Sequence, residues 1–223
     1  EGADIYPTPG FVMEGGSFTV DGEGTLITTE MCLLHESRNP HLNKEQIEKM
    51  LSNYLNLEKV IWIKDGMDPE MTNGHIDDVV CFIRPGEVAC IWTDDPQDIN
   101  YQLCRDAYEI LENATDAKGR KLKIHKLTLP KKPVIRPEGF HYDYDEQSLQ
   151  FDDIDDDSKA SYLNFLITNN GVVVPQFGDE HDELALSQIK EMYPERVVVG
   201  VDTREIIYAG GNIHCITQQQ PSV

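Results

Sequence analysis

The sequence lacks the features that define several classes of protein. No apolar run approaches the roughly 20 residues that a transmembrane helix requires. The five cysteines are an odd number and form no Cys-x-x-Cys pair, so neither a zinc site nor a disulfide framework is indicated. Basic residues are scarce: 19 Lys and Arg stand against 40 Asp and Glu, for a formal net charge of -21.

These absences narrow the function classes. A strongly negative field repels nucleic acid and anionic membranes and attracts cations, including a small cationic substrate. Unpaired cysteines fit a reducing compartment, so we expect a cytoplasmic protein with no nucleic-acid or membrane partner. The 223 residues are enough for one large domain or two small ones with a real core.

An internal repeat is present. Three stretches follow the order strand, strand, helix, strand, each with a turn signal between its first two strands. The predicted strands are 17–21, 25–33 and 59–63, then 77–83, 87–92 and 121–127, then 162–167, 172–174 and 196–200, with helices after Asn43, over 99–113 and over 183–192. Residues 205–208 read as a further short strand. Such a repeat predicts an α/β protein with circular or stacked packing, and the pattern alone does not choose between a propeller and an open sheet.

The first predicted helix has the clearest local signals. Asn43 with Gln46 three residues later forms an N-cap and capping-box pattern. Apolar side chains then recur at helical spacing on one stripe: Ile47, Met50, Leu51, Tyr54 and Leu55.

The stretch around Cys215 is suited to presenting a thiol. The Gly210-Gly211 pair lets the backbone pass close to another group, and Asn212 and His214 stand beside the cysteine. The alternative is that Cys215 is one more small buried hydrophobe, as free cysteines commonly are.

Two further positions carry candidate chemistry. His75 and Asp77 are two residues apart at the start of a predicted strand, where alternation places both side chains on one face. A surface pair or half of a metal site would give the same pattern. Glu14 precedes a Gly-Gly turn, and taken alone it reads most simply as a turn residue.

The segment at about 130–158 differs from the rest of the chain. It holds Pro130, Pro133 and Pro137 and eight acids from Asp143 to Asp157. Low hydrophobicity with dense like charge predicts a loosely packed acidic insertion.

Four ordered stretches resemble the agmatine deiminases, within the guanidine-modifying pentein superfamily. They are Met13–Thr25, Thr72–Asp78 with Cys81–Gly86, Ala160–Phe165 with Pro175–Asp179, and Gly210–Pro221. The resemblance spans nearly the whole chain. It implies a pentein-type α/β propeller of five ββαβ units around an active-site channel, of which residues 1–223 would be the C-terminal part of a single catalytic domain. The chain begins at Glu1 without the upstream Arg-Asp motif of the family, so we expect N-terminal units to be missing from it.

The resemblance also implies a mechanism and the residues that perform it. Cys215 would be the nucleophile, His75 the general acid and then base, Glu14 the residue that orients His75, and Asp77 the group that binds the guanidinium. Agmatine would become N-carbamoylputrescine and ammonia through a covalent thiouronium, a step in polyamine metabolism toward putrescine. No metal or organic cofactor would be needed, and the partners would be the cationic guanidine and further copies in a homo-oligomer.

Three rival functions remain open at this stage. A deiminase of peptidyl arginine or of another guanidine would use the same chemistry with a different tail-binding site. A Cys-His hydrolase of amides is disfavoured because Asp77 and Glu14 suit a cation. An acidic interaction domain without catalysis would leave Cys215 no more reactive than the other cysteines.

Overall fold

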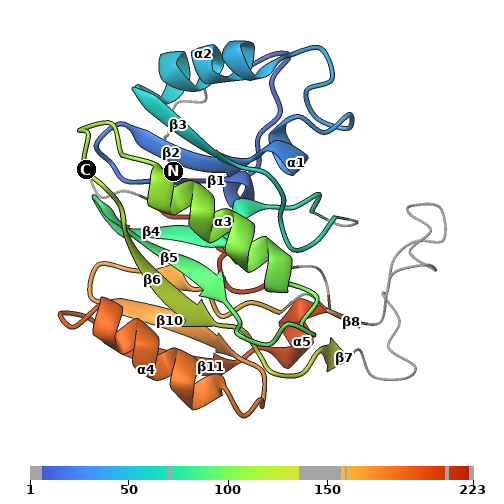
Figure 1. Cartoon of the computed structure of the whole chain (residues 1–223), viewed down its shortest axis with the longest axis vertical. Helices are drawn as coiled ribbons and strands as arrows, with labels where there is room; N and C mark the ends of the chain where they lie inside the picture. The colour runs from blue at the N-terminus through green and yellow to red at the C-terminus, as the bar shows by residue number, and fades with distance from the viewer. Residues whose placement is uncertain (1–6, 70–71, 136–156, 159, 209–210, 221–223) are drawn as a thin grey trace.

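The structure is a computed structural model that describes residues 7–69, 72–135, 157–158, 160–208 and 211–220. In this part of the chain, three small mixed sheets with one long helix each follow one another along the long axis of the molecule (Figure 1). The first unit comprises β1 (Phe18–Val20), β2 (Thr25–Thr29), α2 (Lys44–Leu55) and β3 (Lys59–Ile63). The second comprises β4 (Val80–Arg84), β5 (Glu87–Trp92), α3 (Tyr101–Asn113) and β6 (Lys123–Thr128). The third comprises β9 (Leu166–Ile167), β10 (Gly171–Gln176), α4 (Asp182–Met192) and β11 (Val197–Asp202).

The three sheets have the same topology, which confirms the predicted repeat. In each, the first strand pairs antiparallel with the second, and the second pairs parallel with the third. A parallel neighbour requires a crossover, and the helix of each unit supplies it. Short elements complete the chain: η1 (Gly15–Ser17), α1 (Glu30–Leu33), η2 (Ile76–Asp78), α5 (Arg204–Ile207), and the pair β7 (Val134–Ile135) and β8 (Asp157–Ser158).

Local sequence accounts for the turns and caps. In the first hairpin the Asp21 carboxylate accepts hydrogen bonds from the backbone N–H groups of Glu23 and Thr25, at 2.7 and 2.8 Å, while Gly22 takes a positive φ of 75°. At the start of α2, Asn43 and Gln46 form the predicted capping box with both reciprocal bonds. Ile47 and Leu51 of the predicted stripe are buried, whereas Tyr54 and Leu55 are exposed.

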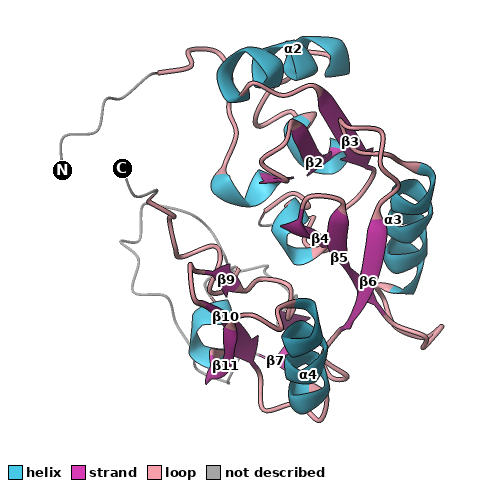
Figure 2. Ribbon diagram, turned by 90° about the vertical axis from the view of Figure 1, so that its left-hand side faces the viewer, coloured by secondary structure: helices cyan, strands magenta, loops and turns pink. Residues whose placement is uncertain are grey.

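The helices of the second and third units also pack against the preceding unit. Helix α3 contacts β3 in addition to β5 and β6, and α4 contacts β6 in addition to β11. Figure 2 shows α3 beside β6 and α4 beside β11. Ile61 and Ile63 of β3 accordingly belong to the apolar cluster of the second and third units, while Leu26, Leu33 and Leu51 form a smaller cluster under α2. The units therefore share one core rather than folding as separate bodies.

Several predicted strand boundaries were wrong. The second strand of the first unit ends at Thr29, because the Thr29 side chain caps the backbone N–H of Cys32 and starts α1. Residues 205–208 are not a strand, since α5 occupies Arg204–Ile207. The strand predicted over 162–167 is reduced to β9, Leu166–Ile167. Most of the predicted acidic insertion, residues 136–156, lies outside the described residues.

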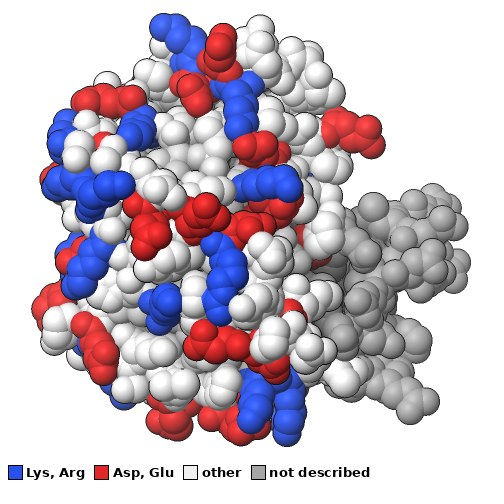
Figure 3. Space-filling model, viewed as in Figure 1, with Lys and Arg blue, Asp and Glu red and all other residues white. Residues whose placement is uncertain are grey.

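Charges of both signs are mixed on one face of the molecule. On the face shown in Figure 3, Lys and Arg side chains are interspersed with Asp and Glu. No helix among the described residues is long and apolar enough to cross a membrane.

Candidate functional site

Four segments from three units meet at the candidate site. Three of them are equivalent in the repeat, because η1, η2 and the loop 160–165 each precede the first strand of their unit. The fourth is the turn at 212–216, in which Ile216 N donates to Asn212 O at 3.2 Å. The repeat therefore brings together residues far apart in the sequence, and Cys215, Asp77 and Asn164 make direct contacts there.

Cys215 is held by one amide side chain. Its Sγ lies 3.2 Å from Asn164 Nδ2, and Asn164 Oδ1 accepts from the backbone N–H groups of His214 and Cys215 at 3.0 and 3.3 Å. Gly211 has a φ of 91°, and a Cβ built there would lie 2.5 Å from the Cys215 sulfur. Only glycine therefore lets the chain fold back over the thiol.

Two carboxylates lie near the Cys215 thiol. Its sulfur lies 3.3 Å from Asp77 Oδ2. Desolvation by the surrounding atoms, followed by the fields of Asp77 and Asp78, raises the pKa of Cys215 to about 12. The site thus holds a thiol in the absence of a cation, although Cys215 as a residue is exposed. A cation bound against the same carboxylates would reverse part of this shift.

Asp77 is the most heavily contacted carboxylate of the site. Its Oδ2 also accepts from His214 Nδ1 at 2.8 Å and from Asn164 Nδ2 at 3.2 Å. The adjacent Asp78 accepts from the same Asn164 amide at 3.0 Å. Burial, and then the neighbouring Asp77, raise the pKa of Asp78 well above its usual range.

His75 and Asp77 come together by a route other than the predicted one. They do not alternate on a strand: His75 is the N-cap of η2, Asp77 lies within it, and β4 begins only at Val80. Both flank Gly16, where an added Cβ would lie 2.5 Å from His75 Nδ1 and 2.8 Å from Asp77 Oδ2. Among the described residues, His75 Nε2 is buried without a hydrogen-bond partner. Desolvation is the main reason that the pKa of His75 is lowered.

Glu14 makes its closest side-chain contacts with an arginine. Arg38 Nε donates to both Glu14 carboxylate oxygens, at 2.7 and 2.9 Å. The nearest approach of Glu14 to His75 Nε2 is 3.9 Å, an ion-pair distance but too long for a hydrogen bond. Glu14 and His75 are therefore within ion-pair distance of each other without a hydrogen bond between them.

Glu14, Cys32 and His75 offer ligand atoms that all lie within 4.8 Å of one another. They fit a metal ion poorly. Arg38 already holds the Glu14 carboxylate, so an ion would lie close to a fixed guanidinium. Burial also raises the pKa of Cys32 to about 12, which opposes formation of the thiolate that a metal would bind.

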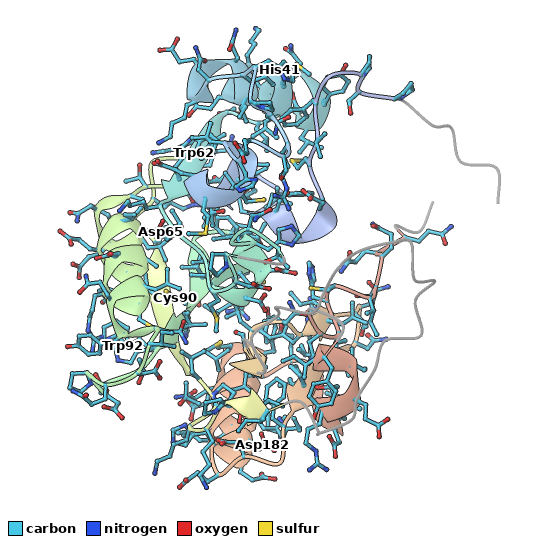
Figure 4. All side chains as sticks on the ribbon, turned by 90° about the vertical axis from the view of Figure 1, so that its right-hand side faces the viewer. His41, Trp62, Asp65, Cys90, Trp92 and Asp182 are labelled. Atoms are coloured by element: carbon cyan, nitrogen blue, oxygen red, sulfur yellow. The ribbon has the colours of Figure 1, made fainter. Side chains whose placement is uncertain are left out.

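The loop that carries Asn164 is anchored on both sides. Ser161 Oγ donates to the Asp78 carbonyl at 2.8 Å, and Tyr162 OH donates to Asp182 Oδ1 at 2.7 Å. Asp182, labelled in Figure 4, lies at the start of α4 and also accepts from the backbone N–H groups of Phe177 and Gly178. Asn164 itself is fully buried.

Sequence reasoning missed four residues of this site: Asp78, Arg38, Asn164 and His214. Asp78, Asn164 and His214 lie inside the stretches that resemble the family. The resemblance could therefore have pointed to these three residues, but it assigned them no role. Arg38 lies outside those stretches. Arg84, which lies inside one of those stretches, is partly exposed, and its guanidinium donates to the Met192 carbonyl at 2.6 Å and to Glu87 at 3.2 Å.

Changing Asn164 to aspartate should slow the reaction of Cys215. The change keeps the oxygen that accepts from His214 and Cys215 N–H, but it replaces the amide donor with a third carboxylate beside Asp77 and Asp78. We expect iodoacetamide labelling of Cys215 to slow by about 10-fold or more, because added negative charge disfavours the thiolate.

Asn39→Asp in the full-length protein is the matched control. Asn39 is also a fully buried amide, but it bonds the Val12 and Leu33 backbone, so its change should lower the Tm without altering the labelling of Cys215 in folded protein. Equal labelling rates in Asn164→Asp and the parent would show that Asn164 does not influence the thiol.

Comparison with known proteins shows the family to which the chain is related. Residues 1–221 match the model of the Porphyromonas-type peptidyl-arginine deiminase family. The agmatine deiminase of Pseudomonas fluorescens is 47% identical over 225 residues, covering 97% of this chain and 59% of that protein. The structure of an agmatine deiminase of Enterococcus faecalis superposes with a TM-score of 0.91 at 58% identity, over 96% of this chain and 58% of that one. A substrate-bound cysteine-to-serine variant of a C. jejuni agmatine deiminase gives a TM-score of 0.75 at 30% identity, over 92% and 55% of the two chains.

The chain belongs to the Porphyromonas-type peptidyl-arginine deiminase family. It spans about three fifths of the length of the curated relatives that it matches, for example 60% of a Streptococcus mutans protein to which it is 60% identical over 222 residues.

Proposed function

We propose that the full-length protein is a cysteine-dependent agmatine deiminase. The observation that carries this proposal is the convergence of the Cys215 sulfur, the Asp77 carboxylate and the Asn164 amide within 3.3 Å of one another, on segments from different repeat units. A thiol beside a buried carboxylate suits attack on a carbon whose substituents are cationic N–H groups. The similarity to proteins named agmatine deiminase, one with substrate bound, supports agmatine as that substrate.

The proposed reaction has two steps. Asp77 binds the guanidinium, whose charge favours the Cys215 thiolate, and the sulfur attacks the central carbon. A C–S bond forms, a C–N bond breaks, and the thiol proton leaves on ammonia by way of His75. Water then adds to the thiouronium carbon, the C–S bond breaks, and N-carbamoylputrescine leaves as the thiol is restored.

The environment of His75 suits the second step. Its lowered pKa favours the neutral imidazole, which is the form that accepts a proton from attacking water. Glu14, 3.9 Å from Nε2, would support the charged form that appears as the proton is transferred. Neither step requires a metal ion or an organic cofactor.

We propose further that the three units are part of a closed propeller. Helix α3 covers Ile61 and Ile63 of the preceding unit, which are buried in the shared core. By strand register, the positions equivalent to these in the third unit are Val199 and Val201, which are 45% and 44% exposed. A helix of another ββαβ unit, from the part of the protein that the relatives have in addition, would cover them as α3 and α4 cover β3 and β6.

The substrate assignment is tested by competition between agmatine and arginine. Free arginine would bring a carboxylate into a site lined by Asp77 and Asp78, and burying an unpaired charge costs several kcal/mol. Arg84, the cation of the matched stretches, is already bonded to Met192 and Glu87. We expect agmatine to be preferred by more than ~10³-fold, equivalent to roughly 4 kcal/mol at the transition state.

The assay uses full-length protein with equal concentrations of both compounds and follows N-carbamoylputrescine and citrulline together. Comparable rates of both products would overturn the agmatine assignment while leaving deiminase chemistry intact. A peptide with internal arginine is included as a third arm, since the family description names peptidyl arginine. Turnover of that peptide at the highest rate would favour the second candidate function.

A further inference from the structure

Arg38 is the most deeply placed cation near the candidate site. It follows α1 in a loop, and its side chain is only 8% exposed. A guanidinium so far removed from water is costly unless its donors are satisfied. Its donors reach two different segments of the chain.

One set of bonds holds Glu14 and the other holds the loop before His75. Nε donates to both Glu14 oxygens, Nη1 donates to Asn73 Oδ1 at 2.6 Å, and Nη2 donates to the Thr72 carbonyl at 3.0 Å. Thr72 and Asn73 come immediately before Gly74 and His75. Arg38 thus fixes the carboxylate and the backbone that delivers the imidazole at the same time.

The loop before His75 is tightly constrained. Asn73 has a positive φ of 53°, which is uncommon for a residue other than glycine, and its side-chain amide also donates to the Pro69 carbonyl at 2.8 Å. Gly74 N donates to Asp68 O at 2.7 Å, and the Gly74 carbonyl accepts from Thr29 Oγ1 at 2.6 Å. Arg38 therefore stabilises an Asn73 conformation that costs free energy.

Arg38 also competes with His75 for Glu14. The charged or titratable groups around His75 are Glu14 before η1, Cys32 on α1, Arg38, Asp68 in the loop after β3, and Asp77 on η2. Of these, Glu14 lies 3.9 Å from Nε2, so a small movement of its carboxylate would allow a hydrogen bond to the imidazole. Its two bonds to Arg38 hold it away.

We propose that Arg38 is a positioning residue for His75: it holds the Glu14 carboxylate at ion-pair distance from the imidazole, short of a hydrogen bond, and it fixes the Thr72-Asn73 turn from which His75 is presented. The kinetic part of this inference rests on the proposed deiminase function. Its electrostatic part does not. The cation of Arg38 opposes protonation of His75, whereas Glu14 and Asp77 favour it, so loss of Arg38 raises the pKa of His75.

The test compares Arg38→Met and Arg38→Lys in the full-length protein. For Arg38→Met we expect the pKa of His75, followed by NMR with ¹³Cε1-labelled histidine, to rise by about one unit. The acid limb of the pH profile of kcat/KM for agmatine should move upward by a similar amount, and kcat at the optimum should fall by ~10²-fold because His75 is misplaced. KM should change little, since Arg38 does not contact the proposed guanidinium site.

Arg38→Lys separates charge from geometry. A lysine ammonium retains the positive charge but cannot donate in three fixed directions. We therefore expect the His75 pKa to stay within about 0.3 unit of the parent while kcat remains ~10-fold low.

Arg120→Met is the matched control, because Arg120 also joins distant segments, through Asp116 and Glu23, away from the site. It should leave the pH profile unchanged.

An unchanged His75 pKa and acid limb in Arg38→Met would overturn the proposal, even if activity fell. If Arg38→Met and Arg120→Met shifted the His75 pKa and the acid limb equally, the proposal would also be overturned, because the shift would then be a general effect of removing an ion pair. If the parent protein turned over no guanidine, the deiminase proposal would fail, and the NMR titration of His75 would still decide the role of Arg38.

Discussion

Replacing Cys215 with alanine is expected to abolish ammonia release from agmatine by the full-length protein while leaving the fold in place. Only Cys215 among the described cysteines is exposed, and its sulfur lies beside Asp77 and Asn164. Loss of the nucleophile removes the covalent step entirely, so turnover should fall by more than ~10³-fold. Little packing is lost with an exposed thiol, and the Tm should change by no more than a few degrees.

Cys81→Ala is the control for this change. Cys81 lies on β4, half-buried against the shared core, and burial raises the pKa of its thiol to about 12. We expect Cys81→Ala to lower the Tm slightly and to retain turnover. If Cys215→Ala releases ammonia at a rate within 10-fold of the parent, Cys215 is not the nucleophile. A 10-fold change in rate corresponds to about 1.4 kcal/mol of activation free energy.

Replacing Asp77 with asparagine is expected to have the second-largest effect. The Asp77 carboxylate is only 5% exposed and accepts from His214, Asn164 and Cys215 through one oxygen. A neutral amide cannot balance a guanidinium, and it can present an N–H to one. We expect kcat/KM for agmatine to fall by ~10²–10³-fold, equal to about 3–4 kcal/mol.

The neighbouring carboxyl provides the comparison. Burial and the neighbouring Asp77 raise the pKa of Asp78 well above its usual range, so its charged form is disfavoured and an amide there removes less charge than at Asp77. Asp78→Asn should therefore cost much less, within ~10-fold in kcat/KM. Losses of equal size at Asp77 and Asp78 would indicate a shared structural role and would remove the special role of the Asp77 charge. Unchanged affinity and turnover in Asp77→Asn would make Asp77 a structural neighbour of His75.

Comparing the Asp77→Asn and Asp78→Asn variants also separates the effect of charge on turnover from the effect on the stability of the fold. Asp77 and Asp78 share the amide of Asn164, so either change disturbs the same buried network. The Tm of both variants measures that disturbance, and the ratio of their kcat/KM values measures the contribution of charge. A large ratio with similar Tm values is the expected result.

Features controlled by near neighbours in the chain could be predicted from the sequence. The capping box at Asn43 joins residues three positions apart, and the Asp21 turn joins residues two and four apart. The order of strands and helices follows from apolar periodicity within each element. The sequence therefore predicts the ββαβ repeat, and it predicts the strands β3 and β5 with their observed bounds.

The same local reasoning failed where a side chain or backbone has a distant partner. The strand predicted over 77–83 begins only at Val80, because residues 76–78 form η2, in which Asp77 and Asp78 reach Asn164, 87 and 86 residues away. Arg38 and Glu14 are 24 residues apart, and neither position has a local pattern that predicts their pair. The Glu205–Tyr208 segment reads as a strand in isolation, and α5 forms there in the fold.

By itself the sequence therefore determined the candidate residues: a thiol at Cys215, an imidazole at His75, and carboxylates at Glu14 and Asp77. Only the tertiary structure decided how they are connected. It placed Asn164 between Asp77 and Cys215, residues 138 positions apart, and it bonded Glu14 to Arg38 at a distance of 3.9 Å from His75. The physical reason is that contacts such as these are set by the packing of segments distant in the chain, within a repeat unit for Glu14 and Arg38 and between units for Asn164, and not by the residues adjacent in the sequence.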